Sequence, residues 1–335
     1  MSLKKFLSAN KMHYLKLLLF NFSLFLAIVG LLELVSFLVL ARYGFSEMLF
    51  FSVAPHKAQM MDYDSRLGWK HFESDFQDGG YRTVNDCIVF TSGLPETTNP
   101  LIIGILGGST TDNISYEHNW PFQLSLKLDS LGFNHVIYNC GVGGYNTNQE
   151  LLKLKRDLLP LNPDIVISYS GVNECQFANP VNFRGAPTSI FPNLGKLLSF
   201  LISYEETLKV LDTKPTDYPS SYDGVAFNWF GNLMKMRTLC MSDSVDFIAV
   251  LQPALGVGKY DYSPSEYSRR YEYYEDFYQY ATPYSMRHQF ILDFTNIFEN
   301  HTNVYTDDCH VREFANRIIA ERIIEHLDTT VTLLK

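Results

Sequence analysis

Four short motifs in the chain contain residue types suited to nucleophilic chemistry. Gly107-Gly108-Ser109-Thr110-Thr111 places a serine among small residues. Two further glycine-containing motifs follow it, Gly141-Val142-Gly143-Gly144 and Gly171-Val172-Asn173-Glu174. In the fourth, Asp307 stands three residues before His310. A carboxylate bonded to imidazole Nδ1 fixes the ring, so that Nε2 can take a proton from a serine.

Each motif also has a plainer interpretation. The glycines before Ser109 could form a phosphate-binding turn, but no Walker lysine follows and the spacing is not G-x-G-x-x-G. Asp307 and Asp308 could merely cap the final helix. If Asp307 orients the histidine, we expect Asp308 to point elsewhere, as an exposed or helix-capping residue. The order and positions of the four motifs favour catalysis.

The elements around these motifs follow an alternating pattern. Short apolar runs predict buried strands, and amphipathic stretches predict helices between them. The expected strands are 101–106, 136–139, 164–170, 245–251 and 289–294, and the expected helices include 120–131, 147–159 and 311–334. A β-α-β-α-β order implies a parallel sheet with right-handed crossovers. Three of the motifs directly follow strands, at the edge where open α/β sheets bind ligands.

Two helix starts and a tyrosine stripe complete this pattern. Capping-box spacings at Thr147 to Glu150 and at Ser263 to Glu266 predict that helices begin there. Along the second helix, tyrosines recur at spacings of three and four: Tyr267, Tyr271, Tyr274 and Tyr278. They could stack on sugars, but a stripe at helical spacing is more typical of a packed face.

Taken together, the motifs resemble the four blocks of the SGNH or GDSL serine hydrolases. The match runs from about Leu101 to Leu327, although no motif aligns between Cys175 and Met234. The resemblance implies an α/β, three-layer, flavodoxin-like SGNH-hydrolase fold with a parallel central sheet. It implies an ester hydrolase that uses no cofactor or metal. The implied roles are Ser109 as nucleophile, His310 as base, Asp307 as its orienter, and an oxyanion hole formed by the Ser109 amide, the Gly144 amide and the Asn173 side chain.

The chain departs from the family pattern at two places. Glu174 stands where the third block usually has aspartate. The upstream Gly-Trp segment resembles that of membrane-attached bacterial members but is degenerate after Gly80. Neither departure removes an expected catalytic group.

Composition excludes several other classes of protein. The chain has 335 residues, 46% of them hydrophobic, which is enough for a buried core and unlike a disordered protein. A net charge of −9 argues against a nucleic-acid partner. The five cysteines have no paired C-x-x-C spacing, so they predict neither a disulfide framework nor a zinc site, and at most an incidental bridge.

The first 42 residues predict a membrane anchor. Residues 17–41 contain one charge, Glu33, and are long enough to cross a bilayer as a helix. The run is too long for the apolar region of a signal peptide and lacks an A-x-A site. Four lysines precede it and only Arg42 follows closely, so residues 1–16 should be cytoplasmic. Glu33 could be functional, but a place near the outer interface or against a partner helix is the simpler interpretation.

The expected protein is therefore a single-pass, extracytoplasmic, membrane-anchored serine esterase. Residues 42–98 form a connecting segment packed on the domain, and 99–335 form the hydrolase domain, with residues 176–225 as an insertion. The external part has a net charge of −13, so it should not bind anionic lipid headgroups. Expected substrates are acylated or acetylated envelope glycans, or a lipid ester. The alternatives are an O-acyltransferase of envelope polysaccharide with the same residues, and a non-catalytic glycan-binding or assembly subunit.

Overall fold

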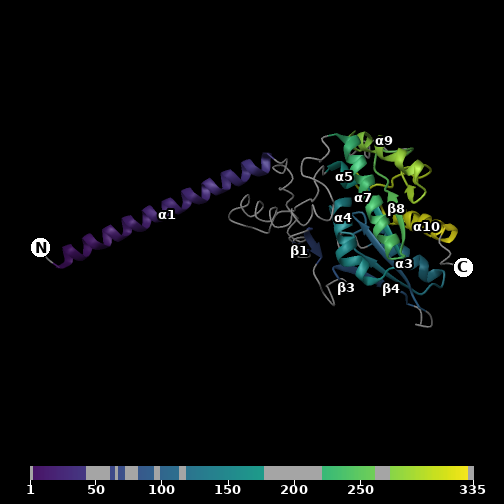
Figure 1. Cartoon of the computed structure of the whole chain (residues 1–335), viewed down its shortest axis with the longest axis horizontal. Coiled ribbons are helices and arrows are strands. Elements are labelled where there is room, and N and C mark those ends of the chain that lie inside the picture. The colour runs from purple at the N-terminus through teal and green to yellow at the C-terminus, as the bar shows by residue number, and fades with distance from the viewer. Residues whose placement is uncertain are drawn as a thin grey trace.

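A seven-stranded sheet between helices forms the body of the protein (Figure 1). The computed structural model describes residues 3–42, 61–64, 67–71, 82–93, 99–112, 118–176, 221–260 and 272–330. The strand order is β3-β4-β6-β5-β7-β8-β9. Neighbouring strands from β6 to β9 pair in parallel, as the β-α-β pattern predicted, and the α/β fold class is confirmed.

The parallel strands begin and end close to the predicted positions. They are β5 (Leu101–Gly107), β6 (His135–Asn139), β7 (Ile165–Ser170), β8 (Asp246–Leu251) and β9 (Ile291–Asp293). The helices between and after them are α3 (Trp120–Ser130), α4 (Thr147–Lys153), α5 (Val172–Gln176), α7 (Tyr222–Ser242), α9 (Glu272–Arg287) and α10 (Glu313–Thr330). After α4 the chain continues through a π-helical turn, Leu154–Leu158, and a short 3-10 turn, Leu159–Leu161.

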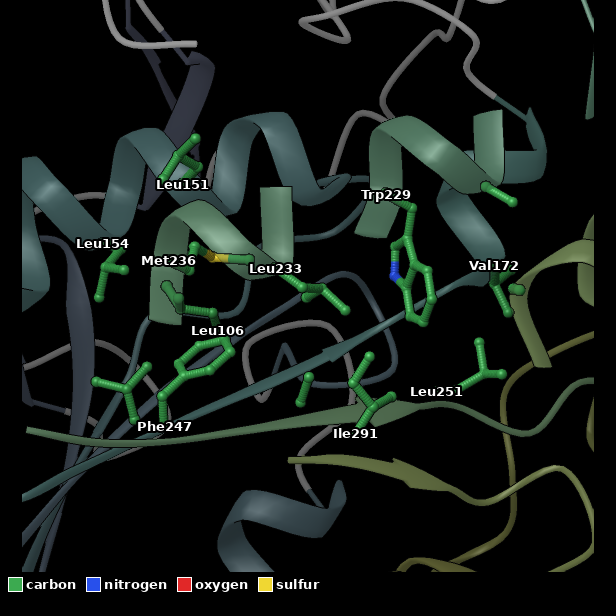
Figure 2. Close-up of a cluster of buried hydrophobic side chains, with 14 of the residues drawn as sticks. Leu106, Leu151, Leu154, Val172, Trp229, Leu233, Met236, Phe247, Leu251 and Ile291 are labelled. Carbon is green, nitrogen blue, oxygen red and sulfur yellow. The ribbon is translucent and has the colours of Figure 1, made fainter. Parts of the chain in front are cut away.

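Two apolar cores cover the two faces of the sheet, because successive strand residues point to opposite sides. On one face, Ile103 and Ile105 of β5 pack in a cluster with residues of α3 and α10. On the other face, Leu106 packs with residues of α4, α7 and α9 (Figure 2). Figure 2 shows Trp229, Leu233 and Met236 of α7 above strand residues Phe247 and Leu251. The result is the expected three-layer arrangement.

The upstream segment contributes strands that the sequence did not predict. β3 (Arg82–Val84) and β4 (Cys87–Thr91) form a hairpin, and β4 pairs antiparallel with β6. A second, separate hairpin joins β1 (Met61–Asp64) to β2 (Gly68–His71). The expected connecting segment therefore supplies the edge strand β3 and its neighbour β4 at one side of the central sheet.

A disulfide and a buried ionic cluster attach this edge hairpin to the domain. Cys87 of β4 is bonded to Cys140, the residue after β6. Beside it, the buried Lys153 ammonium lies 3.1 Å from Asp157 Oδ2 and donates to the Asp86 carbonyl at 3.2 Å. Burial lowers the pKa of Lys153, while Asp157 and Asp86 oppose that shift. The odd cysteine count had predicted at most one incidental bridge. The bridge that is present joins β4 to the end of β6.

Helix α1 (Leu3–Arg42) contains the predicted apolar span. Lys16–Ser36 is 21 residues long with a mean hydropathy of 2.3, which is long and apolar enough to cross a membrane. Its large side chains are exposed, with Leu18 and Phe20 each 65% accessible. Such a helix is also found as a signal sequence, so the anchor stays a prediction at this point.

Two sequence expectations fall wholly or mainly outside the described residues. The capping box at Ser263 to Glu266 is one of them. The insertion is the other, since of 176–225 only its first residue, in α5, and its last five, at the start of α7, are described. Of the tyrosine stripe, Tyr267 and Tyr271 also lie outside the described residues. Tyr274 and Tyr278 are buried in the core, which supports packing over sugar stacking for these two.

We predict that the disulfide makes a large contribution to stability. Replacing both Cys87 and Cys140 by alanine should lower the free energy of unfolding by about 4 kcal/mol, because the bond closes a loop with a sequence separation of 53. Urea denaturation of the two proteins measures the difference. A reductant should destabilise only the wild-type protein, and an equal effect on the double variant would contradict the prediction.

Candidate active site

Ser109 lies in a tight loop directly after β5. Gly108 O accepts the amides of Thr111 and Asp112, both at 3.0 Å, so the chain turns sharply around Ser109. A Cβ on Gly107 would lie 2.3 Å from Thr111 Oγ1, so this position requires glycine. Asn119 Nδ2 donates to Ser109 O at 3.0 Å and anchors the loop. Ser109 is half-buried at the carboxyl edge of the sheet.

The second motif forms a β-turn after β6. Tyr145 N donates to Val142 O at 3.0 Å, and Gly144 has φ of +85°. A positive φ at the third position of a four-residue turn is typical of type II and favours glycine. Val142 N donates to Gly107 O at 3.0 Å, which places this turn against the Ser109 loop.

Asn173 lies beside both of these loops. It belongs to α5, which follows β7, and its Nδ2 donates to Tyr145 O at 2.7 Å. A Cβ built on Gly108 would lie only 2.2 Å from Asn173 Nδ2. Asn173 is thus adjacent to the residue before Ser109 and to the residue after Gly144. The structure brings the three expected oxyanion-hole residues into one neighbourhood.

Glu174, which stands where the family usually has aspartate, is accommodated by hydrogen bonds to two backbone amides. Its two carboxylate oxygens accept the amides of Thr147 at 2.6 Å and Gly171 at 3.1 Å. Glu174 therefore ties the Asn173 turn to the start of α4. Burial raises the pKa of Glu174, although these hydrogen bonds act in the opposite direction.

The start of α4 differs by one residue from the prediction. Asn146, not Thr147, is the N-cap, and its side chain accepts the amides of Asn148 and Gln149. Gln149 completes the capping box in place of Glu150, because asparagine caps a helix at least as well as threonine. Glu150 instead points inward and accepts Ser168 Oγ at 2.6 Å. Burial, with the nearby charge of Glu174, raises the pKa of Glu150 well above its ordinary value.

Asp307 and His310 form a close pair. His310 Nδ1 lies 2.7 Å from Asp307 Oδ2, while Asp307 Oδ1 accepts the amides of Cys309 at 2.9 Å and His310 at 2.7 Å. Burial opposes ionisation of Asp307, but the His310 side chain and these two amides outweigh it and lower the pKa of the carboxyl. Asp307 is thus ionised at neutral pH and fixes the ring of His310 through Nδ1.

The neighbouring Asp308 has a different function from the one expected. Its carboxylate accepts a hydrogen bond from the Tyr274 hydroxyl of α9, and its carbonyl accepts the Leu255 amide at 2.9 Å. Asp308 is therefore neither a fully exposed residue nor a helix cap. It attaches the Asp307–His310 turn to α9 and to the loop after β8.

The backbone of Asp308 places this turn at the same edge of the sheet as Ser109, because its carbonyl accepts the amide of Leu255 in the loop after β8. Burial, with the nearby Cys309 thiol, raises the pKa of Tyr169 well above its ordinary value. Tyr169 of β7 is the lateral neighbour of Gly107, two residues before Ser109. The serine loop and the Asp307–His310 turn therefore lie at the same edge of the sheet, although they are far apart in the sequence. A hydrogen bond from Ser109 Oγ to His310 Nε2 remains a prediction.

The same turn offers ligand atoms to a metal ion. Asp307, Cys309 and His310 each place one ligand atom within 4.8 Å of the others. His310 Nδ1 is already paired with Asp307, so a metal there would compete with the contact that orients the ring. The expectation that the enzyme uses no metal or cofactor stays a prediction.

Sequence comparison defines the class of protein. The GDSL-like lipase/acylhydrolase family matches residues 105–310, and the chain belongs to this family. It is a carboxylic-ester hydrolase of the SGNH type by family. No curated protein matches the chain.

Solved structures with a similar fold are distant in sequence. They include an acetyl xylan esterase (TM-score 0.44, 15% identity, covering 68% of this chain and 99% of that one). A GDSL-like lipase from Bacteroides thetaiotaomicron VPI-5482 gives a TM-score of 0.41 and 12% identity, over 69% of this chain and 89% of that one. A lipase/acylhydrolase from Enterococcus faecalis gives 0.38 and 13%, over 68% and 95%.

We predict unequal effects of substituting the two adjacent aspartates. Asp307→Asn should lower kcat about 10⁴-fold, because the amide favours the wrong tautomer of His310. Asp308→Asn should cost at most a few-fold, since an amide oxygen can still accept from Tyr274. Ester hydrolysis by the two purified variants measures this. Equal and mild losses would reject Asp307 as the orienting residue.

We also predict that Glu150 makes stability depend on pH. Its raised pKa means that the folded protein holds this proton to higher pH than the unfolded chain does. Stability is therefore lost as pH rises from the ordinary carboxyl pKa through the folded one. Glu150→Gln removes this loss and keeps an acceptor for Ser168. Urea denaturation between pH 4 and 8 should show the variant's advantage growing with pH.

Glu174→Gln is the comparison for Glu150→Gln, because it makes the same change at the second buried glutamate. Glutamine has one acceptor oxygen for the two amides that Glu174 accepts, so this variant should lose about 1 to 3 kcal/mol. If the curves of wild type and Glu150→Gln run parallel across the pH range, Glu150 does not titrate as argued.

Proposed function

We propose that the protein is a membrane-anchored, extracytoplasmic serine esterase in which Ser109 is the nucleophile and His310 the general base. The observation that carries this proposal is the 2.7 Å pairing of His310 Nδ1 with Asp307 Oδ2. This pairing supports Nε2 as the atom that accepts the serine proton. The oxyanion hole comprises the amides of Ser109 and Gly144 and the side chain of Asn173.

The reaction proceeds through an acyl-enzyme. Ser109 Oγ attacks the ester carbonyl as its proton passes to His310 Nε2, and the oxyanion develops opposite the three donors. The intermediate collapses, the bond to the leaving oxygen breaks, and that oxygen takes the proton from His310. Water then attacks the acyl-serine, with His310 again accepting and returning a proton, and releases a carboxylic acid. Asp307 stabilises the imidazolium in both halves.

Two features support the proposed location. Helix α1 carries an exposed apolar stretch of 21 residues, Lys16–Ser36, preceded by lysines. The Cys87–Cys140 disulfide supports an oxidising compartment, because such bonds are rare in the cytosol. Residues 1–16 are then cytoplasmic, and the hydrolase domain lies outside.

The proposed substrate class follows from this location. An esterase anchored at the outer face of a membrane meets acylated or acetylated glycans of the envelope, with lipid esters as the next candidates. These assignments rest on location and not on the site itself. A sugar hydroxyl in place of water in the second half-reaction would make the same site an O-acyltransferase.

One labelling experiment tests both the nucleophile and the location. A membrane-impermeant fluorophosphonate should label the full-length chain at Ser109 in intact spheroplasts, and Ser109→Ala should abolish the label at equal protein level. Ser92→Ala, outside the four motifs, provides the control and should label normally. Label that appears only after permeabilisation would refute the location, and label on another residue would refute the nucleophile.

A product assay then distinguishes hydrolysis from transfer. The detergent-solubilised chain, given an acetyl ester with and without a glycan acceptor, should release acetate at a rate that the acceptor does not reduce. If acetate release falls while acetylated glycan forms, the protein is an acyltransferase. Either product requires Ser109.

A further inference from the structure

A buried histidine from the upstream segment reaches the candidate active site. His71 is the last residue of β2, nearly forty residues before Ser109 in sequence, and its side chain is 0% exposed. Its Nε2 lies 3.2 Å from Oδ1 of Asp112, which is also 0% exposed. The two atoms are not aligned as a hydrogen bond, so this is an electrostatic contact between buried polar groups.

Asp112 connects this histidine to the β-turn from Val142 to Tyr145, which we call the glycine turn. Its other oxygen, Oδ2, accepts the Gly143 amide at 3.2 Å. Its own amide donates to Gly108 O at 3.0 Å, and its carbonyl accepts Asn119 Nδ2 at 2.8 Å. Asp112 therefore lies between His71 on one side and the serine loop and Gly143 on the other.

Holding Gly143 has a specific consequence for the next amide. The Gly144 N–H lies in the peptide plane that joins Gly143 to Gly144, at the centre of the turn from Val142 to Tyr145. The Gly143 N–H belongs to the preceding peptide plane, which joins Val142 to Gly143. An acceptor at 3.2 Å therefore fixes the backbone directly before the plane that carries the Gly144 N–H. The direction of the proposed Gly144 oxyanion donor thus depends on the position of the Asp112 carboxylate.

A second contact ties the same upstream segment to the other side of the glycine turn. Gln149 Nε2 donates to the carbonyl of the buried Leu67 at 2.7 Å. Gln149 also completes the capping box with Asn146, two residues after Gly144. The stretch from Leu67 to His71 therefore contacts Asp112, which holds Gly143, and Gln149, which follows the turn.

We propose that His71 is a positioning residue that holds Asp112, and through it the Val142–Gly143 peptide directly before the Gly144 amide, in the geometry of the oxyanion hole; this rests on the proposed esterase function. Without His71, the buried Asp112 carboxylate loses a polar partner and must rotate or take up a proton. Either change weakens its hold on the Gly143 amide. Small displacements of a catalytic donor reduce kcat far more than they reduce ground-state binding.

The test compares substitutions at His71 with a matched buried histidine. In the full-length detergent-solubilised chain, His71→Leu should lower kcat for p-nitrophenyl acetate by roughly tenfold to a hundredfold, with KM changed less than about twofold. His71→Gln, which keeps a polar N–H group beside Asp112, should recover most of the loss. His135 is also 0% exposed, and its ring contacts Ser125 Oγ at 2.8 Å, at the opposite end of β6. His135→Leu should lower stability while leaving kcat per folded molecule unchanged.

A double-variant cycle tests whether His71 and Asp112 act together on kcat, and not merely on folding. Asp112→Asn should reproduce the loss in kcat, and combining it with His71→Leu should add little, because the two residues act as one unit. Equal kcat in the His71 and His135 variants, or full additivity with Asp112→Asn, would overturn the proposal. If wild type hydrolyses no ester, the proposed function has failed instead, and the two failures are distinguishable.

Discussion

Backbone amides at one edge of the sheet are held in place by buried or half-buried carboxylates, and the proposed site depends on this constraint. Asp112 accepts the amide of Gly143, and Glu174 accepts those of Thr147 and Gly171. Asp307 accepts the amides of Cys309 and His310. Loops have no ladder of hydrogen bonds to orient them, so these carboxylate acceptors provide the orientation.

The balance between burial and hydrogen bonding, which sets the direction of each pKa shift, differs among Asp307, Glu174 and Glu150. Asp307 is partly exposed and paired with a histidine, and its pKa is lowered. Glu174 accepts two amides but is deeply buried, and its pKa is raised. Glu150 has a hydroxyl partner and a nearby carboxylate, so its pKa is raised further above the ordinary range. The chain therefore keeps the carboxylate beside the histidine charged and tolerates less favourable ionisation at the two glutamates behind the glycine turn.

The sequence predicted what depends on local pattern. The parallel strands showed as apolar runs, and the Asp307–His310 pairing follows from a three-residue spacing. The edge hairpin was missed because β3 has only three residues and its attachment is long-range, through Cys87 to Cys140. His71 gave no signal, because a lone histidine has no partner that sequence spacing reveals. Its contact with Asp112 spans 41 positions and exists only in the folded chain.

The cross-strand disulfide also determines what proteolysis could do to this protein. Cys87 lies before the segment between β4 and β5, and Cys140 lies after it. A protease that cut between Thr91 and Leu101 would break the chain without separating its parts, because the disulfide would still join the catalytic portion to the polypeptide that carries α1. With α1 as the proposed membrane anchor, release of the hydrolase domain from such a nicked molecule would require a reductant as well as a protease. A single cut before Met61 would instead release β2, His71 and the hydrolase domain together.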